Sequence, residues 1–146
     1  MGRIFKMNQL ADMLKVEEGF RSHVYDDHLG YKTIGYGRCI ESGVGLGISE
    51  DEATYLLMQD IDRSVAECEN FEWFADLDDS RSMVIVALAF QMGWPRLNTF
   101  GNMLAAMADE DYARAADELL DSKFARQVPD RAKRLSEIIR TGEWDA

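Results

Sequence analysis

Two carboxylates and a hydroxyl stand close together in the first quarter of the sequence. Glu18 closes an apolar periodic stretch, Asp27 lies nine residues later in a turn region rich in tyrosine and glycine, and Thr33 follows six residues after that. Because a hairpin after a helix folds back toward the helix end, Asp27 and Thr33 can come within several ångströms of Glu18. Glycoside hydrolysis needs such a pair: one acid protonates the leaving oxygen, and one carboxylate handles water or the anomeric carbon. The alternative is that both acids are ordinary solvated residues of a helix end and a turn.

The pattern of apolar residues predicts the elements that position these side chains. Residues 8–17 carry their apolar residues along one helical face, and Gly19 ends this periodic stretch. Residues 20–40 are rich in aromatic and β-branched residues and are punctuated by glycines, which predicts a small twisted antiparallel sheet. The chemistry is therefore expected where the first helix meets the sheet.

A long helix and a helical region follow the sheet. Ser49 and Glu52 form a capping box, which predicts the start of a helix whose apolar face runs to Cys68. The run 83–90 is apolar on all sides, which is typical of a helix in the middle of a core, and a serine at position 80 or 82 is expected to cap it. Further helices are expected near 99–107 and 110–120, and from Pro129 to a stop at Gly142.

These elements predict an α+β protein in which a long helix joins a small antiparallel sheet lobe to a helical lobe. We expect the whole chain, 1–146, to form a single domain. The sheet lobe is expected at about 13–50 and the connecting helix at about 49–69. The helical lobe is expected at about 70–146, with the first helix added to it.

Composition excludes several classes of protein. The chain has 146 residues and a net charge of −11, and an acidic protein is a poor partner for nucleic acid. Twelve acids but only one base, Arg63, lie between Glu41 and Asp79. No run of about 18 apolar residues is present, which argues against insertion in a membrane. The N-terminus lacks the apolar core of a signal peptide, so we expect the protein to stay in the cytoplasm where it is made.

Metal and phosphate sites are not expected either. Cys39 and Cys68 have no CxxC spacing and are interpreted as free thiols, and the two histidines, His23 and His28, do not suggest a metal site. The glycines at 43, 45 and 47 lack the spacing of a phosphate-binding loop and are interpreted as a plain loop. The sequence therefore predicts a protein without cofactor or metal.

Three stretches, in this order, resemble the phage-type lysozymes, the endolysin family of the T-even phages. The first is residues 13–37, MLKVEEGFRSHVYDDHLGYKTIGYG, and the second is residues 89–93, AFQMG. The third is the tail, with QVPDRAKR at 127–134 and RTGEWDA at 140–146. The matches extend over nearly the whole chain, and the resemblance implies a lysozyme-like fold.

The resemblance also implies a role for individual residues. It makes Glu18 the general acid, rather than the adjacent Glu17, and Asp27 the carboxylate that orients water and steadies the oxocarbenium charge, rather than Asp26. It makes Thr33 a second group that holds the water. The family's carbohydrate contacts fall at Cys39, Phe90, Met103 and Glu118, of which the last two do not match the family residue types well. For Phe90, a plain core aromatic remains an equal alternative.

Two departures from the family pattern stand near the sheet. Arg38 occupies the position after the Ile-Gly-x-Gly turn, where the family commonly has histidine, and we expect it to pair with Asp60 on the long helix. The loop between the sheet and the long helix is also short. Both departures bear on substrate reach and stability rather than on the chemistry.

The function implied is that of an endolysin muramidase, which hydrolyses the β-1,4 bond between N-acetylmuramic acid and N-acetylglucosamine in bacterial peptidoglycan with inversion. We expect a monomer that is made in the host cytoplasm and reaches the periplasm or cell wall at lysis, exported with the help of a holin. One alternative is a catalytically weak peptidoglycan-binding or structural relative. Another is a lysozyme-like toxin or phage tail component with the same chemistry.

Overall fold

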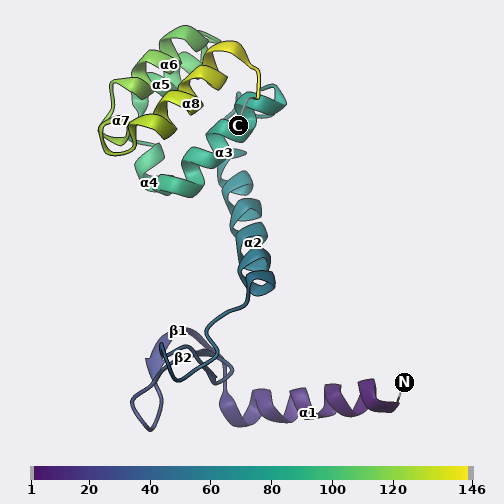
Figure 1. Ribbon diagram of the computed structural model, residues 1–146. Helices are drawn as coiled ribbons and strands as arrows, with labels where there is room; N and C mark the ends of the chain where they lie inside the picture. The colour runs from purple at the N-terminus through teal and green to yellow at the C-terminus, as the bar shows by residue number, and fades with distance from the viewer. Residues whose placement is uncertain (1, 145–146) are drawn as a thin grey trace. The chain divides into compact units, whose positions relative to one another are not determined.

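The computed structural model describes residues 2–144, with side chains from residue 6 onward. The chain forms two compact units, Met1–Thr54 and Tyr55–Ala146, here called the sheet unit and the helical unit. Helix α2 (Glu50–Cys68) begins in the first unit and continues in the second (Figure 1). The predicted α+β class is confirmed, while the single domain spanning the whole chain stays a prediction.

The sheet unit consists of one helix and a three-stranded antiparallel sheet. Its elements are α1 (Gly2–Glu18), β1 (Arg21–Asp26), β2 (Lys32–Gly35) and β3 (Arg38–Cys39), with the strands in the order β1-β2-β3. Gly19 ends α1 in a left-handed conformation, with φ +71, and its N–H donates to Lys15 O at 3.0 Å. A glycine takes this conformation without the steric penalty of a side chain, so the chain can turn directly from the helix into β1.

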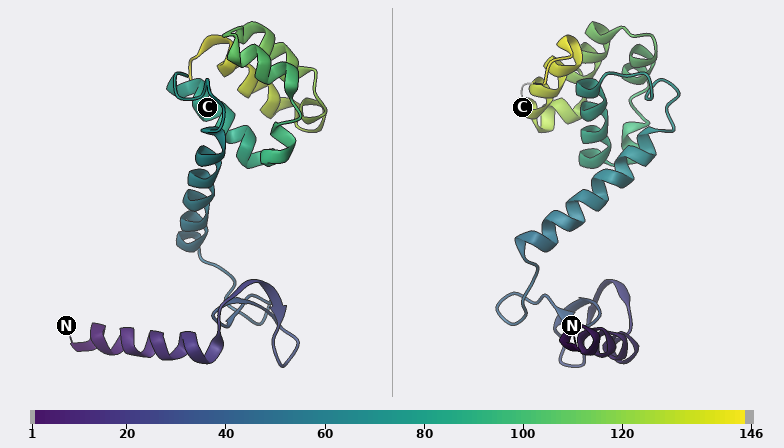
Figure 2. Two further views of the ribbon diagram at one scale, coloured as in Figure 1. Left: turned by 180° about the vertical axis from the view of Figure 1, so that it is seen from behind. Right: turned by 90° about the vertical axis from the view of Figure 1, so that its right-hand side faces the viewer.

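The helical unit is built around α3 (Asp79–Met92), whose Val84, Ile85 and Leu88 are completely buried. The other helices of this unit are α4 (Trp94–Leu97), α5 (Gly101–Ala108), α6 (Tyr112–Leu120), α7 (Lys123–Gln127) and α8 (Pro129–Thr141). Helix α8 packs against α3, α6 and α7, and α5 packs against α6, as Figures 1 and 2 show. Burial of apolar side chains from all of these helices makes the core that stabilises this unit.

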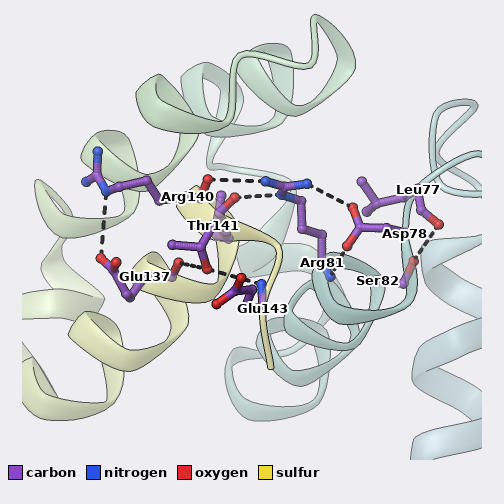
Figure 3. A network of polar contacts seen from close by, with 9 residues as sticks. Leu77, Asp78, Arg81, Ser82, Glu137, Arg140, Thr141 and Glu143 are labelled. Carbon is purple, nitrogen blue, oxygen red and sulfur yellow. Dashed lines mark hydrogen bonds and ion pairs between the residues drawn. The ribbon is translucent and has the colours of Figure 1, made fainter. Parts of the chain in front are cut away.

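Arg81 joins the start of α3 to the end of α8 (Figure 3). Its Nε donates to Ile139 O at 2.6 Å and its Nη2 to Arg140 O at 3.2 Å, while Nη1 pairs with Asp78 Oδ1 at 3.1 Å. The guanidinium carbon also lies 3.7 Å from the centroid of the Tyr112 ring. The last turn of a helix leaves carbonyl oxygens without intrahelical partners, and Arg81 supplies partners for two of them.

Most predicted helices are confirmed, with four corrections. The predicted capping box is present, since Ser49 N donates to Glu52 Oε1 at 2.9 Å and Glu52 N to Ser49 Oγ at 3.1 Å. The serine cap predicted for α3 is wrong, because Asp78 lies one position before the helix and its carboxylate accepts from Arg81 N at 3.1 Å. Helices α4 and α7 were not predicted, and α3 is not enclosed on all sides, since Phe90 is 43% exposed.

Candidate active site

Glu18 is the last residue of α1, and its side chain lies against the turn between β2 and β3. A Cβ atom at Gly37 would lie 2.5 Å from Glu18 Oε2, so only glycine leaves room for the carboxylate in its present position. The Phe20 and Tyr36 rings, 5.7 Å apart, hold the chain after α1 against the same turn. The end of the helix is thereby fixed next to the strand turn by local contacts.

Asp27 closes the loop between β1 and β2 with its own side chain. Its Oδ1 accepts hydrogen bonds from Leu29 N at 2.8 Å and Tyr31 N at 2.9 Å. The Tyr31 N–H is the largest cause that lowers the pKa of Asp27 below the ordinary value of 3.8, because this hydrogen bond stabilises the charged form. The other oxygen, Oδ2, accepts no hydrogen bond from any described residue. Asp27 is therefore an oriented anion with one oxygen available to a ligand or a water.

Thr33 is the one buried side chain among residues 6–54, with 3% of its surface exposed. Its hydroxyl donates to Tyr31 O at 2.9 Å. Because the hydroxyl proton is used in this bond, Thr33 can act toward a water molecule only as an acceptor. Thr33 pairs with Tyr25 on β1 and with Cys39 on β3, and residues paired in this way lie on one face of the sheet.

The backbone of Tyr31 connects two of the three catalytic candidates. Its N–H donates to Asp27 and its carbonyl accepts from Thr33, so both side chains are positioned by one peptide segment. Glu18 reaches the same small sheet at the turn after β2. The sheet unit thus carries Glu18, Asp27 and Thr33 together, and Cys39 lies beside Thr33.

Tyr31 and Gly37 were not predicted from the sequence to be parts of this site. Tyr31 acts only through its backbone, and backbone groups leave no pattern in a sequence. The spacing of Asp27 and Gly30, which is typical of an Asx turn, could have indicated that the Tyr31 backbone contacts Asp27. Gly37 has φ +73, and its place after Tyr36 in a two-residue hairpin turn was the corresponding signal. Both residues position the proposed chemical groups rather than supply them.

Arg38 forms an ion pair, but not with the predicted partner. Its Nη2 lies 2.6 Å from Glu52 Oε2 and its Nη1 donates to Glu52 Oε1 at 3.1 Å, whereas Asp60 pairs with Arg63 at 2.9 Å. The prediction of an Arg38–Asp60 pair is therefore wrong. Glu52 lies in the first turn of α2, directly after the loop that β3 leads into, and its carboxylate is already oriented by Ser49. The Ser49 hydrogen bonds, followed by that of Arg38, lower the pKa of Glu52.

The other predicted carbohydrate contacts belong to the helical unit. Met103 and Glu118 line one pocket of about 370 Å³, although Met103 itself is 1% exposed and offers little surface. Phe90 does not line that pocket; it contributes to two others along α3. Its exposed ring shows that Phe90 is not simply a core aromatic.

The described residues give no indication of a metal site. No three histidine, cysteine, aspartate or glutamate side chains within residues 6–144 gather closely enough to hold an ion. Cys39 and Cys68 are free thiols, as predicted, and burial raises the pKa of Cys68 to about 12, so this thiol is not a nucleophile at neutral pH. Among residues 2–144, every helix is too short or too polar to cross a lipid bilayer.

Comparison with known proteins identifies one matching family and several similar proteins. The family model described as "Phage lysozyme" matches residues 15–137. The chain is 28% identical to "Probable T4-type lysozyme 1" of Dictyostelium discoideum, over 96% of this chain and 98% of that protein. It is 30% identical to "Pre-baseplate central spike protein Gp5" of Enterobacteria phage T4, over 94% of this chain and 28% of that protein. It is also 28% identical to "Peptidoglycan hydrolase gp36" of Pseudomonas phage phiKMV, over 80% of this chain and 13% of that protein.

Proposed function

Because the chain belongs to the phage lysozyme family, we propose that it hydrolyses the β-1,4 bond between N-acetylmuramic acid and N-acetylglucosamine in bacterial peptidoglycan. One relative is named a peptidoglycan hydrolase, and two carry lysozyme in their names, which supports this substrate class. The matched range 15–137 includes Glu18, Asp27 and Thr33. The observation that carries the proposal is an oriented anion, Asp27, in the same unit as a second carboxyl, Glu18, which lies against the turn between β2 and β3.

In the proposed mechanism the three side chains have separate tasks. Glu18 donates its proton to the glycosidic oxygen as the bond between that oxygen and the anomeric carbon breaks. A water molecule attacks the anomeric carbon from the opposite face, while Asp27 accepts its proton and stabilises the positive charge that develops on the sugar. Thr33 accepts a hydrogen bond from the same water. This water needs room, so inversion requires the Glu18 and Asp27 carboxyls to lie roughly 6.5–9.5 Å apart.

The test is the identity of the reducing ends released from purified cell wall. Reducing muramic acid ends, identified by borohydride reduction and mass spectrometry, are expected. Reducing glucosamine ends would instead make the protein a different glycosidase. The anomeric configuration of the first product, followed by NMR, tests inversion, and a retained configuration would contradict it.

For the biological setting we propose an endolysin that acts as a monomer without cofactor, is made in the host cytoplasm and reaches the wall with the help of a holin. Co-expression with a holin should cause abrupt lysis of the cells, and expression without one should not. The similarity to a pre-baseplate central spike protein favours the tail component as the second candidate. Detection of the chain in purified virions, together with failure of the holin experiment, would favour that alternative.

A catalytically weak binding relative is the remaining alternative. Such a protein would bind purified wall but would not clear a suspension of wall material. A turbidity assay on cell walls, run beside a sedimentation assay for binding, separates the two functions directly. Binding without clearing would refute the proposed hydrolase.

A further inference from the structure

One of the two pockets beside Phe90 combines aromatic and polar side chains in its lining. It has a volume of about 370 Å³ and lies where α2, α3 and α4 meet. Its lining includes two aromatic residues, Phe90 and Trp94, and four polar ones, Asp60, Arg63, Ser64 and Glu67. Pockets that bind small molecules commonly combine aromatic walls with a few convergent polar groups.

Ser64 is the most informative of these residues. It is 5% exposed, and its hydroxyl forms no hydrogen bond with another described side chain or backbone group. Among the described residues, Ser136 Oγ is the only side-chain nitrogen or oxygen that is both fully enclosed and without a partner. The Ser64 hydroxyl must therefore reach the pocket that the residue lines. A buried hydroxyl without a protein partner is stabilised when a ligand or water supplies one.

The aromatic walls are held in place from behind. The Trp94 ring packs 4.9 Å from that of Phe71, which is stacked at 4.8 Å on Trp73, so Trp94 is fixed at the edge of the pocket. Phe90 is 43% exposed beside it. A fixed indole presents an apolar face together with one N–H donor, and this combination suits the C–H face and hydroxyl groups of a pyranose ring.

The charges in the pocket favour a neutral ligand that donates hydrogen bonds. Arg63 is already paired with Asp60 at 2.9 Å, while Glu67 has no ion-pair partner among the described residues. An anionic ligand would meet an uncompensated carboxylate at Glu67. Sugar hydroxyl and acetamido N–H groups can donate to this carboxylate without adding charge.

We propose that this pocket is an accessory subsite for one N-acetylhexosamine unit of a glycan strand. Trp94 provides the platform, the Glu67 carboxylate accepts hydrogen bonds from the sugar, and the Ser64 hydroxyl donates or accepts one. Of the residues that line this pocket, only Phe90 is a contact implied by the resemblance; the pocket adds Trp94, Ser64 and Glu67. The identity of the sugar rests on the proposed function, because that function supplies the strand to which the unit belongs.

The test is a titration of the ¹⁵N-labelled full chain with chitotriose, the N-acetylglucosamine trimer, followed by NMR. Saturable shifts of the Trp94 indole N–H and the Ser64 amide are expected. Glu67→Gln should weaken binding about tenfold, because a charge-assisted hydrogen bond becomes a neutral one. Glu69→Gln, an exposed change in the turn directly after α2 that does not line the pocket, is the matched control and should bind as the wild type does.

A second variant tests the pocket by filling it. Ser64→Leu should abolish the Trp94 shift, provided that circular dichroism shows a folded protein; if it does not fold, Glu67→Gln decides. Saturation without a shift at Trp94 and Ser64, or equal affinities of Glu67→Gln and the wild type, would overturn the subsite. If the protein releases muramic acid ends but lacks these shifts, the subsite fails and the proposed function stands. If the shifts occur without hydrolysis of wall, the proposed function fails and the subsite stands.

Discussion

The two units of the chain maintain their structure in different ways. In the sheet unit, Thr33 is the only buried side chain among residues 6–54, and positions are set by backbone hydrogen bonds, an Asx turn and glycines with positive φ. In the helical unit, a core of buried apolar side chains extends from Cys68 to Ile139. The proposed catalytic site is thus positioned by local turn chemistry, without an apolar core of its own. Changes in the sheet unit should therefore affect activity, and changes in the helical core should affect stability.

The largest effect is expected for Glu18→Gln, because an amide cannot donate the proton that the leaving oxygen needs. The rate of wall hydrolysis should fall by roughly 10²–10⁴-fold, with no change in the denaturant midpoint, since the residue is exposed at a helix end. The adjacent Glu17→Gln is the control and should keep its activity. More than about a tenth of the wild-type rate in Glu18→Gln would remove Glu18 from the role of acid.

Substitutions at Asp27 distinguish the contribution of its charge from the contribution of its turn geometry. In Asp27→Asn the amide oxygen can still accept from Leu29 N and Tyr31 N, so the loop should persist while the rate falls roughly 10²–10³-fold. Asp27→Ala should lose the turn as well, with a visible change in the amide NMR spectrum of the loop. Asp26→Asn, which removes only an exposed pair with Lys32, is the control. Equal activity of Asp27→Asn and the wild type would contradict the need for the charge.

The lowered pKa of Asp27 predicts how stability and activity depend on pH. The pKa of Asp27 is lowered in the folded protein, so its contribution to stability is complete above the ordinary value of 3.8 and is lost as pH falls through the lower folded value. The part of the acid limb of activity that depends on Asp27 should therefore lie below pH 3.8. An NMR titration of the Asp27 carboxyl with a midpoint above 3.8 would contradict this.

In the helical core, substitutions are expected to lower stability rather than activity. Ile85 is fully buried, and Ile85→Ala should lower the free energy of unfolding by about 2–5 kcal/mol, whereas Ile85→Val should lower it by about 0.5–1.5 kcal/mol. Denaturant unfolding measures both. At a temperature where each variant is folded, wall hydrolysis per folded molecule should stay close to the wild-type rate. A specific loss of rate in folded Ile85→Val would break the distinction between the two units.

Arg81 tests polar contacts in the helical unit. Arg81→Ala leaves the carbonyls of Ile139 and Arg140 and the carboxylate of Asp78 without this partner, which should cost about 1–3 kcal/mol of unfolding free energy. Arg114→Ala, an exposed change on α6, should stay within about 0.5 kcal/mol of the wild type. Equal stabilities of the two variants would show that Arg81 contributes nothing beyond an ordinary surface arginine.

The smallest and most local effect concerns two glycines of the sheet. Gly35 and Gly37 have φ +70 and +73, so alanine at either should cost a similar backbone strain of about 1–2 kcal/mol. Only at Gly37 would the new methyl group meet Glu18 Oε2, whereas Gly35 has nothing within 4 Å. Gly37→Ala should therefore lose about tenfold more activity than Gly35→Ala. Equal rates would show that the present position of Glu18 is not the one used in catalysis.

The sequence was informative wherever a signal was local or periodic. The helix boundaries near Gly19, Ser49 and Gly142 were predicted because caps are local, and each is observed. The partner of Arg38 was not predictable in this way, because Glu52 and Asp60 both lie on the same predicted helix and only the path of the loop decides between them. The α3 cap was predicted wrongly because Ser80 and Ser82, which lie close to Asp78 in the sequence, are also residue types that commonly cap a helix.

For the candidate site, the sequence indicated the chemical groups but not the contacts that hold them in position. Residue type and spacing singled out Glu18, Asp27 and Thr33, and the sheet unit carries all three. The hydrogen bonds that orient Asp27 and Thr33 come from one backbone segment, and backbone groups are the same in every residue. The contents of the pocket at Trp94 were equally hidden, because it draws on three helices whose packing no local pattern specifies.

The Arg81 contacts have a consequence for the order of events during synthesis. Arg81 and the carbonyls of Ile139 and Arg140 are 58 and 59 residues apart in the chain, and α8 also packs against α3, α6 and α7. Such long-range contacts cannot form until the ribosome has translated and released α8, so the helical unit is completed late. Until then, α3 emerges with its apolar surface uncovered. Nascent chains stalled before Pro129 should accordingly be sensitive to protease, and chains extended well beyond Gly142 should be resistant.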